Sequence, residues 1–93
     1  MIRSFADKQT AKIHEGDRSR TLPADIQARA NMKLIRIDQA TQLEQLMLPP
    51  SNRLETLTGN LKGFCSIRIN QQWRIVFRWQ EGDAFDVRIT DYH

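Results

Sequence analysis

Five polar side chains in the second half of the sequence could together handle a phosphate group and the protons around it. Three of them, Asp91, Tyr92 and His93, follow directly on a strand-like run. The other two, Arg68 and Arg74, stand in earlier runs where arginines alternate with apolar residues. Metal-free cleavage of RNA needs a base for the ribose 2′-hydroxyl, an acid for the leaving oxygen and cations for the phosphorane charge. These residue types predict a phosphate site with acid–base groups beside it.

The first of two predicted hairpins decides whether the arginines meet. Pairing Ile67 with Ile75 keeps the apolar residues of both strands on one face and leaves a loop at residues 70–72. A two-residue loop would turn one strand inside out. The preferred register places Arg68 directly opposite Arg74 on the other face. Like charges in that position destabilise a sheet by up to roughly 1 kcal/mol, and a bound anion would remove the penalty.

The second hairpin is predicted in the same way. Pairing Phe77 with Val87 keeps its apolar rows together and leaves a three-residue turn, Glu81-Gly82-Asp83. Arg78 then faces Asp86, a favourable cross-strand charge pair with a structural role.

This second register also places the last residues of the sequence. Arg74 faces Thr90, so Tyr92 falls one step further along the same row, with His93 beside it and Asp91 nearby. Both hairpins thus converge on one cluster, which we expect on an open face of the sheet. A β-bulge between the strands would change this outcome.

The remaining pattern supplies the elements that carry this cluster. Helical spacing of apolar residues comes first and strand-like alternation follows, with two prolines between them. The expected elements are a short strand at 2–5, helices at 7–15, 23–40 and 43–48, and strands at 53–57, 64–69, 73–80 and 84–89. The order predicts an α+β fold, with N-terminal helices packed on one face of a small antiparallel sheet.

Composition indicates one small soluble domain over residues 1–93. Hydrophobic residues make up 40% and charged residues 27% of the 93. No apolar run approaches the length of about 18 residues that a membrane helix needs, and Asp7 and Lys8 stand where a signal peptide would be apolar. A single cysteine, Cys65, fits a reducing compartment. We expect a cytoplasmic protein without membrane contact.

The charge pattern favours an anionic partner. The net charge is +3, and ten arginines stand against four lysines. Arginine makes forked contacts to phosphate or carboxylate. The expected contacts to RNA or phosphate are Arg68, Lys62 and Arg53. Arg29, Lys33 and Arg36 share one face of the second predicted helix; this is either a solvated face or a further RNA contact.

Metal or cofactor chemistry is not indicated. Two histidines, one cysteine and no clustered carboxylates make a metal site improbable, and no nucleotide-binding loop is recognisable. Cys65, Trp73 and Trp79 stand in the apolar rows of the predicted strands and are interpreted as core residues.

Several motifs resemble the HigB toxins of bacterial toxin–antitoxin pairs, within the RelE superfamily. The similarity runs essentially end to end and is most specific where a Trp-Arg strand and a final Asp-Tyr-His occur together. The motifs are Asn52-Arg53-Leu54-Glu55, Leu61-Lys62-Gly63-Phe64, Ser66-Ile67-Arg68-Ile69-Asn70, Trp73-Arg74-Ile75-Val76-Phe77 and Asp91-Tyr92-His93.

This resemblance implies a RelE-like fold and a ribosome-dependent, metal-independent endoribonuclease that cuts mRNA and so inhibits translation. It implies that a HigA-type antitoxin holds the toxin inactive, and that operator DNA is bound only through the antitoxin complex. On the matching positions it implies that Arg74, Asp91, Tyr92 and His93 are catalytic.

The sequence departs from the family pattern at two positions. Many relatives have a histidine and a lysine where this chain has Glu55 and Thr58, and the family treats that lysine as part of the active site. Reduced activity is therefore expected. The alternatives are a weak or non-catalytic toxin that binds the ribosome or RNA, a corepressor acting through its antitoxin complex, and an interaction domain whose basic face meets an acidic protein.

Overall fold

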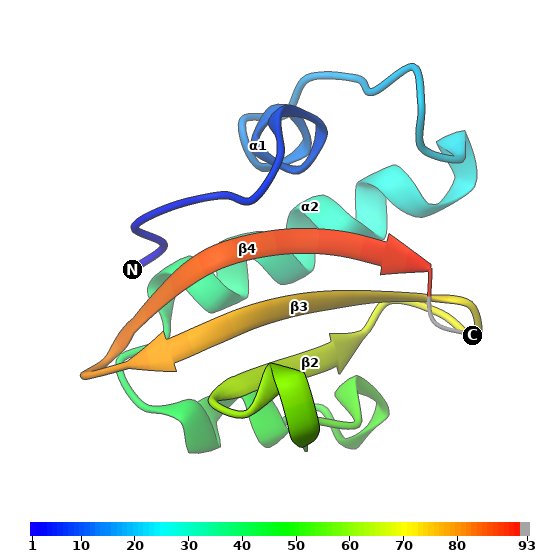
Figure 1. Cartoon of the computed structure of the whole chain (residues 1–93). Helices are drawn as coiled ribbons and strands as arrows, with labels where there is room; N and C mark the ends of the chain where they lie inside the picture. The colour runs from blue at the N-terminus through cyan, green and yellow to red at the C-terminus, as the bar shows by residue number, and fades with distance from the viewer. Residues whose placement is uncertain (92–93) are drawn as a thin grey trace.

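The computed structural model describes residues 1–91, and its elements follow the order expected from the sequence (Figure 1). Two helices precede a four-stranded antiparallel sheet with the strand order β1-β2-β3-β4, so the α+β prediction is confirmed. The helices are α1 (Lys8–His14) and α2 (Ala24–Gln39); the 3-10 turns are η1 (Leu43–Met47), η2 (Pro50–Asn52) and η3 (Gly59–Leu61); the strands are β1 (Glu55–Thr56), β2 (Phe64–Arg68), β3 (Trp73–Gln80) and β4 (Asp83–Asp91).

Helix α1 begins after its cap at Asp7 and ends before Gly16, as the sequence predicts. The Asp7 side chain accepts a hydrogen bond from the backbone N–H of Thr10 at 2.7 Å, which satisfies one of the donors left free in the first turn. Gly16, with φ of 90°, follows the last turn, and only glycine adopts this backbone conformation without strain.

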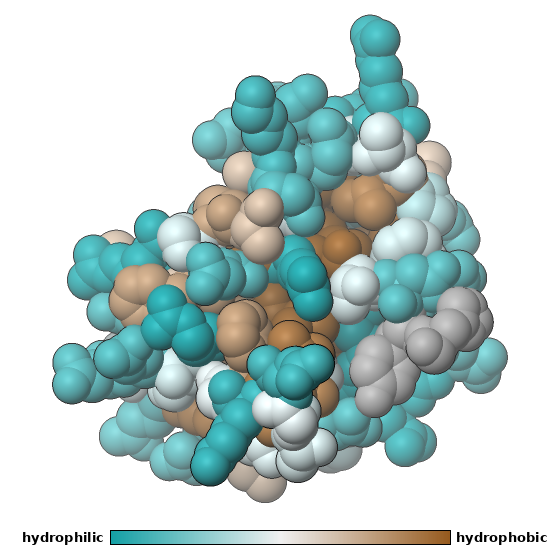
Figure 2. Space-filling view, viewed as in Figure 1, coloured by the Kyte–Doolittle hydropathy of each residue, from teal (hydrophilic) through white to brown (hydrophobic). Residues whose placement is uncertain are grey.

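The core lies between α2 and the apolar row of the sheet. Ile26, Ala30, Leu34 and Ile37 form the buried stripe of α2, as their helical spacing predicts. They belong to one cluster with buried residues of β2, β3 and β4, which include Phe77. Figure 2 shows hydrophobic side chains near the centre of the viewed face and hydrophilic ones around them. This single layer of contacts holds the sheet rigidly enough to position a site on its strands.

The first hairpin has the predicted register. Ile67 pairs with Ile75 and Arg68 with Arg74, and the N–H of Ile69 donates to the carbonyl of Trp73 at 2.8 Å. The alternation of apolar residues over both strands therefore determined the pairing, because a one-residue slip would have exposed the whole apolar row.

The second hairpin differs from the prediction near its turn. Gln80 pairs with Asp83, so the turn is the two residues Glu81 and Gly82, with φ of 51° and 85°, rather than three. Positive φ at both positions matches the right-handed twist of the strands. A two-residue turn alone would place the wrong face of β4 against the core.

A β-bulge brings the apolar residues of β4 back to the face that packs on the core. The register shifts between Val76 and Arg78, and Asp86 at this point has φ of 53°. One extra residue on β4 restores the apolar row, so Ile75 still pairs with Ile89. The predicted pairing of Arg78 with Asp86 was wrong, because Arg78 pairs with Phe85, whereas Phe77 stands opposite the bulge itself.

The expected contact of Arg78 with Asp86 nevertheless forms across the bulge. Arg78 Nε lies 3.6 Å from Asp86 Oδ2, and the guanidinium carbon lies 4.8 Å from the centre of the Phe85 ring. The bulge lies on the turn side of Arg74, so the predicted pairing of Arg74 with Thr90 is unchanged.

Strand β1 is shorter than predicted and covers only two of the residues 53–57. Arg53, with φ of 45°, ends η2 in the left-handed region and so cannot continue a strand. This turn determines where the backbone carbonyl of Arg53 points, and that carbonyl becomes part of the candidate site below.

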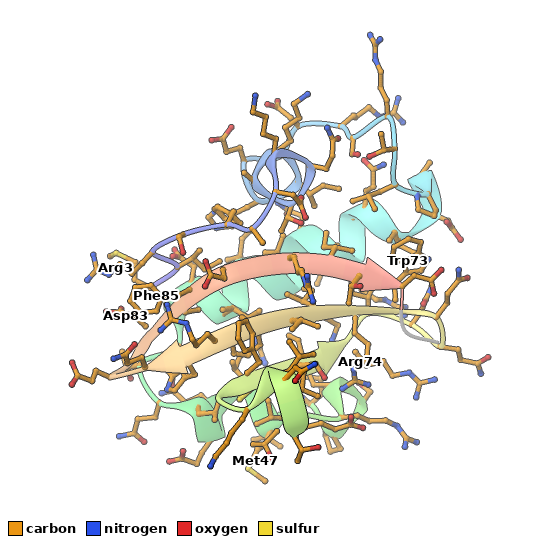
Figure 3. The ribbon with its side chains drawn as sticks, in the orientation of Figure 1. Arg3, Met47, Trp73, Arg74, Asp83 and Phe85 are labelled. Carbon is orange, nitrogen blue, oxygen red and sulfur yellow. The ribbon has the colours of Figure 1, made fainter. Side chains whose placement is uncertain are left out.

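The N-terminal segment covers the free edge of β4. Ile2 and Phe5 form isolated parallel bridges to Ala84 and Val87 in place of the expected short strand. The terminal amine and Arg3 Nε lie 3.3 and 3.2 Å from the two carboxylate oxygens of Asp83 (Figure 3). A covered edge is protected from pairing with another chain.

The contacts with Arg3 and the terminal amine change the pKa of the Asp83 carboxyl. Loss of hydration acts to raise its pKa, but hydrogen bonds and charges from Arg3 and the terminal amine outweigh that effect and lower the pKa. Since the folded-state pKa is the lower one, the stabilisation is present above the unfolded pKa and is lost as the pH falls through the folded value.

Candidate active site

Arg74 is the buried centre of the candidate site. Its Nε donates to Ser66 Oγ at 2.9 Å, and its Nη2 donates to the carbonyl oxygens of Arg53 and Ser66 at 2.6 and 3.3 Å (Figure 3). Glu55 Oε2 lies 4.0 Å from Nη2. With 5% of Arg74 exposed, the expectation that its side chain lies on an open face was wrong.

The burial of Arg74 follows from what surrounds it. Ser66, its neighbour on β2, is small and fully buried, so the guanidinium can lie across it. The carbonyl of Arg53 arrives from the left-handed turn after η2. Buried charge is tolerated only where hydrogen bonds and a counter-charge satisfy it, and the partners named above do both.

Arg68 binds a different partner although it stands opposite Arg74. Its Nε donates to the carbonyl of Asn70 at 3.0 Å, and the residue is half-buried. Among residues 1–91, the hydrogen bonds of the two guanidinium groups go to different oxygens. These protein oxygens offset part of the repulsion predicted for the pair. Arg68 keeps part of its surface open to solvent.

Asp91 ends the last strand beside this pair. It is the cross-strand partner of Trp73, and its Oδ2 accepts a hydrogen bond from Gln72 Nε2 at 3.0 Å. Tyr92 and His93, the next two residues, lie outside the described residues. What the structure does establish is the register up to Asp91.

The other predicted phosphate contacts lie around the β1 edge. Arg53 and Lys62 are exposed, before β1 and after η3 respectively. The backbone of Arg53, and not only its side chain, serves the site, through the hydrogen bond to Arg74. Glu55 pairs with Ser66 across the sheet, and Thr58 is the exposed residue before η3. The sequence reasoning missed Ser66 and the turn at Arg53, for which no local signal existed.

Residues interpreted as core are found there. Cys65 is buried, and burial raises the pKa of its thiol, which disfavours the reactive thiolate. Trp73 and Trp79 are partly buried against the core, and Trp79 packs edge-on to Phe77 with 6.3 Å between ring centres.

Within residues 1–91, no three or more His, Cys, Asp or Glu side chains gather as a metal site would require.

The basic face of α2 is not simply solvated, because its cations tie the helix to other segments. Arg29 Nη1 donates to the carbonyl of Ile69 at 3.2 Å, and Arg36 Nη2 to that of Leu48, also at 3.2 Å. Lys33 Nζ donates to Asn52 Oδ1. These contacts connect α2 to η2 and to the end of β2.

Asn52 is the central link of this connection, and its removal should destabilise the fold. The residue is 2% exposed, and its Nδ2 donates to the carbonyls of Leu46 and Leu48, both at 3.1 Å. Asn52→Ala leaves these acceptors without their partner, so we expect the free energy of unfolding to fall by about 1–3 kcal/mol. Urea unfolding measures the change. Ser51→Ala, at an exposed neighbour, is the control, and an equal effect of both variants would contradict the prediction.

Comparison with known proteins decides the family. A model of the HigB-like toxins, RelE-like toxins of the type II toxin–antitoxin system HigB, matches residues 3–93. The chain belongs to this family. It is therefore a RelE-like toxin, as the motifs at Trp73-Arg74 and Asp91-Tyr92-His93 indicated.

Two relatives of this HigB-like toxin match along nearly their whole length. Toxin HigB-1 of Vibrio cholerae serotype O1 is 42% identical over 93 residues, covering 99% of this chain and 98% of the relative. Endoribonuclease HigB of Proteus vulgaris is 34% identical and is covered completely, as is this chain.

Solved structures support the fold of the toxin. The YoeB dimer from Staphylococcus aureus has a TM-score of 0.60 at 21% identity and covers 99% of this chain and 94% of its own. YafQ from Escherichia coli has a TM-score of 0.58 at 16% identity and covers 98% and 91%. In residues 1–91, no helix has the length and apolar character needed to cross a membrane.

Proposed function

We propose that this toxin is a metal-independent endoribonuclease that cuts mRNA on the ribosome, and that a HigA-type antitoxin holds it inactive. The observation that carries the proposal is the convergence of Arg68, Arg74 and the end of β4 through two hairpin registers. The Proteus vulgaris relative named as an endoribonuclease supports the activity. YoeB of Staphylococcus aureus, which has this fold, is found in a complex with the antitoxin YefM, which supports the partner.

In the proposed cleavage reaction, each residue of the candidate site has its own role. His93 transfers a proton, Tyr92 orients or stacks on the nucleotide, and Asp91, the last residue of β4, is the third catalytic residue of this segment. Arg74 supplies positive charge for the phosphorane, and its hydrogen bonds to Ser66 and to the Arg53 carbonyl hold the local backbone. Arg68, which is only half-buried, contacts phosphate directly. Lys62 and Arg53 extend the phosphate contacts along the β1 edge.

One observation favours a weaker toxin as the second candidate, because Glu55 lies 4.0 Å from the Arg74 guanidinium and partly offsets its charge. The family resemblance further implies a lysine at the position of Thr58, which carries no charge. A toxin that binds the ribosome or RNA without cutting, or acts as a corepressor within its antitoxin complex, would fit both. Operator DNA is then contacted through the antitoxin alone.

Primer extension on mRNA in a purified translation system separates the candidates and tests the metal requirement. The toxin is first treated with EDTA and desalted, then added to ribosomes programmed with mRNA in their usual magnesium buffer. We expect discrete cuts with ribosomes and none on naked mRNA, at the rate of untreated toxin. Inhibited translation with intact mRNA would support the non-catalytic candidate. Cutting that returns only after a trace transition metal is added would refute the metal-free chemistry.

A further inference from the structure

An apolar groove runs along α2 on the face that lies away from Arg74. Its volume is about 1190 Å³, and it lies between α2, residues 48–52 and the end of β2. We call it the α2 groove. Its aliphatic lining includes Ile26, Met32, Ile35, Leu48, Ile67 and Ile69. Strand alternation places Ile67 and Ile69 toward α2 and Arg74 on the other face of the sheet.

Large apolar side chains stand exposed along the rim of this groove. Met32 is 66% exposed, Ile35 40% and Leu48 62%. Single exposed apolar side chains are ordinary, but exposed apolar side chains that gather around one groove are typical of an interaction site. Methionine adapts its shape to a partner because its side chain is unbranched and polarisable.

Three basic side chains line the same groove, against the single carboxylate of Asp25. Arg29, Lys33 and Arg36 border it, and a second hollow of about 470 Å³ shares Arg29 and Lys33 and adds Arg68. Within residues 1–91, none of these four cations makes an ion pair. Burial, then the charges of Arg29 and Arg36, lower the pKa of Lys33, as expected where positive charge is crowded.

The chemistry of the lining favours a protein ligand over RNA. RNA-binding surfaces stack bases on aromatic rings, and no lining residue of the α2 groove in the described chain is aromatic. A second copy of this chain is disfavoured as well, because a two-fold pairing of grooves would bring like charges together. Apolar side chains with acidic neighbours are the complement of this surface.

We propose that the α2 groove binds an amphipathic, acidic helix of the antitoxin. Apolar side chains of that helix enter the groove between Met32 and Leu48, and its carboxylates meet Arg29, Lys33 and Arg36. These three cations span two turns of α2, or about 10 Å of helix axis. A helix laid in a groove by residues spaced three and four apart is a common mode of peptide recognition. The inference depends on the proposed function in one respect, namely that the partner is an antitoxin.

Affinity measurements on paired variants test the groove. The probe is the HigA-type antitoxin encoded beside this toxin, titrated by calorimetry. Met32→Asp places a carboxylate against an apolar part of the partner, and Arg29→Glu places one against an acidic part. For each variant we expect the dissociation constant for the antitoxin to rise tenfold or more, as it does when a residue central to an interface is changed. Met47→Asp is the matched apolar control, since Met47 is 57% exposed and does not line the groove. Arg88→Glu, on the exposed side of β4, is the matched charge control.

The two controls should bind as the wild type does, and all four variants should keep their cleavage of ribosome-bound mRNA. Unchanged antitoxin affinity of Met32→Asp would overturn the proposal. Lost cleavage with unchanged antitoxin affinity would assign the groove to the ribosome or RNA instead, and a changed oligomeric state would assign it to a second copy. No antitoxin binding by the wild type would refute this inference and its partner, while the cleavage assay still tests the nuclease function.

A photo-crosslinking residue tests the groove independently if the Met32→Asp variant does not fold. Placed at position 32, it should form a covalent adduct with the antitoxin, and at position 47 it should not. Equal adducts at both positions, or none at position 32, would contradict the groove.

Discussion

His93→Gln is expected to slow the cleavage of ribosome-bound mRNA by about a hundred- to ten-thousand-fold, the usual cost of removing a proton-transfer group. Histidine ordinarily titrates near pH 6.5, so it can give and take a proton at neutral pH, whereas glutamine cannot. Glutamine keeps a similar size and hydrogen bonding, so the variant should remain folded and bind its antitoxin. Single-turnover cleavage and growth inhibition measure the effect.

The chain offers a matched control in its other histidine. His14 ends α1, a helix that contributes no residue to the candidate site, and its ring centre lies 5.4 Å from that of Phe5. His14→Gln should therefore cleave as the wild type does. Wild-type cleavage by His93→Gln would show that another group carries the proton, and would remove His93 from the proposed mechanism.

Arg74→Ala is expected to have the second largest effect, and mainly on stability. The guanidinium is buried among Ser66, the Arg53 carbonyl and Glu55, so its removal leaves several buried polar groups without a partner. Each buried acceptor left without its donor costs about 1–3 kcal/mol, whereas the contact with the exposed Glu55 carboxylate adds little. Small domains have about 5–15 kcal/mol of stability in total, so the variant should be partly unfolded at growth temperature.

Comparison with Arg68 separates the structural role from the charge. Arg68→Ala removes an equal charge from the opposite strand, but the residue is half-buried and makes one hydrogen bond to Asn70. It should therefore lose little stability while weakening RNA binding. Urea unfolding of both variants, with Arg74→Lys as a charge-retaining comparison, measures the difference. Equal and small losses for Arg74→Ala and Arg68→Ala would contradict the structural role of Arg74.

Both predictions concern a site whose parts differ in how well the sequence specified them. The pairing of Arg68 with Arg74 followed from alternation over two strands, which is a local property of the chain. The catalytic assignment of Asp91, Tyr92 and His93 followed from family resemblance and stays a prediction. Only Asp91 among these three is described, at the end of β4.

The sequence by itself determined those features that depend on neighbouring residues. The buried stripe of α2, the cap at Asp7 and the first hairpin register each arise from spacing within a few residues. Tertiary structure decided the rest. Two turn lengths satisfied the second hairpin, and the shorter one was possible only because a bulge at Asp86 restored the apolar face. Arg74 is buried because a carbonyl 21 residues earlier in the chain turns toward it, and no local pattern encodes a contact between such distant segments.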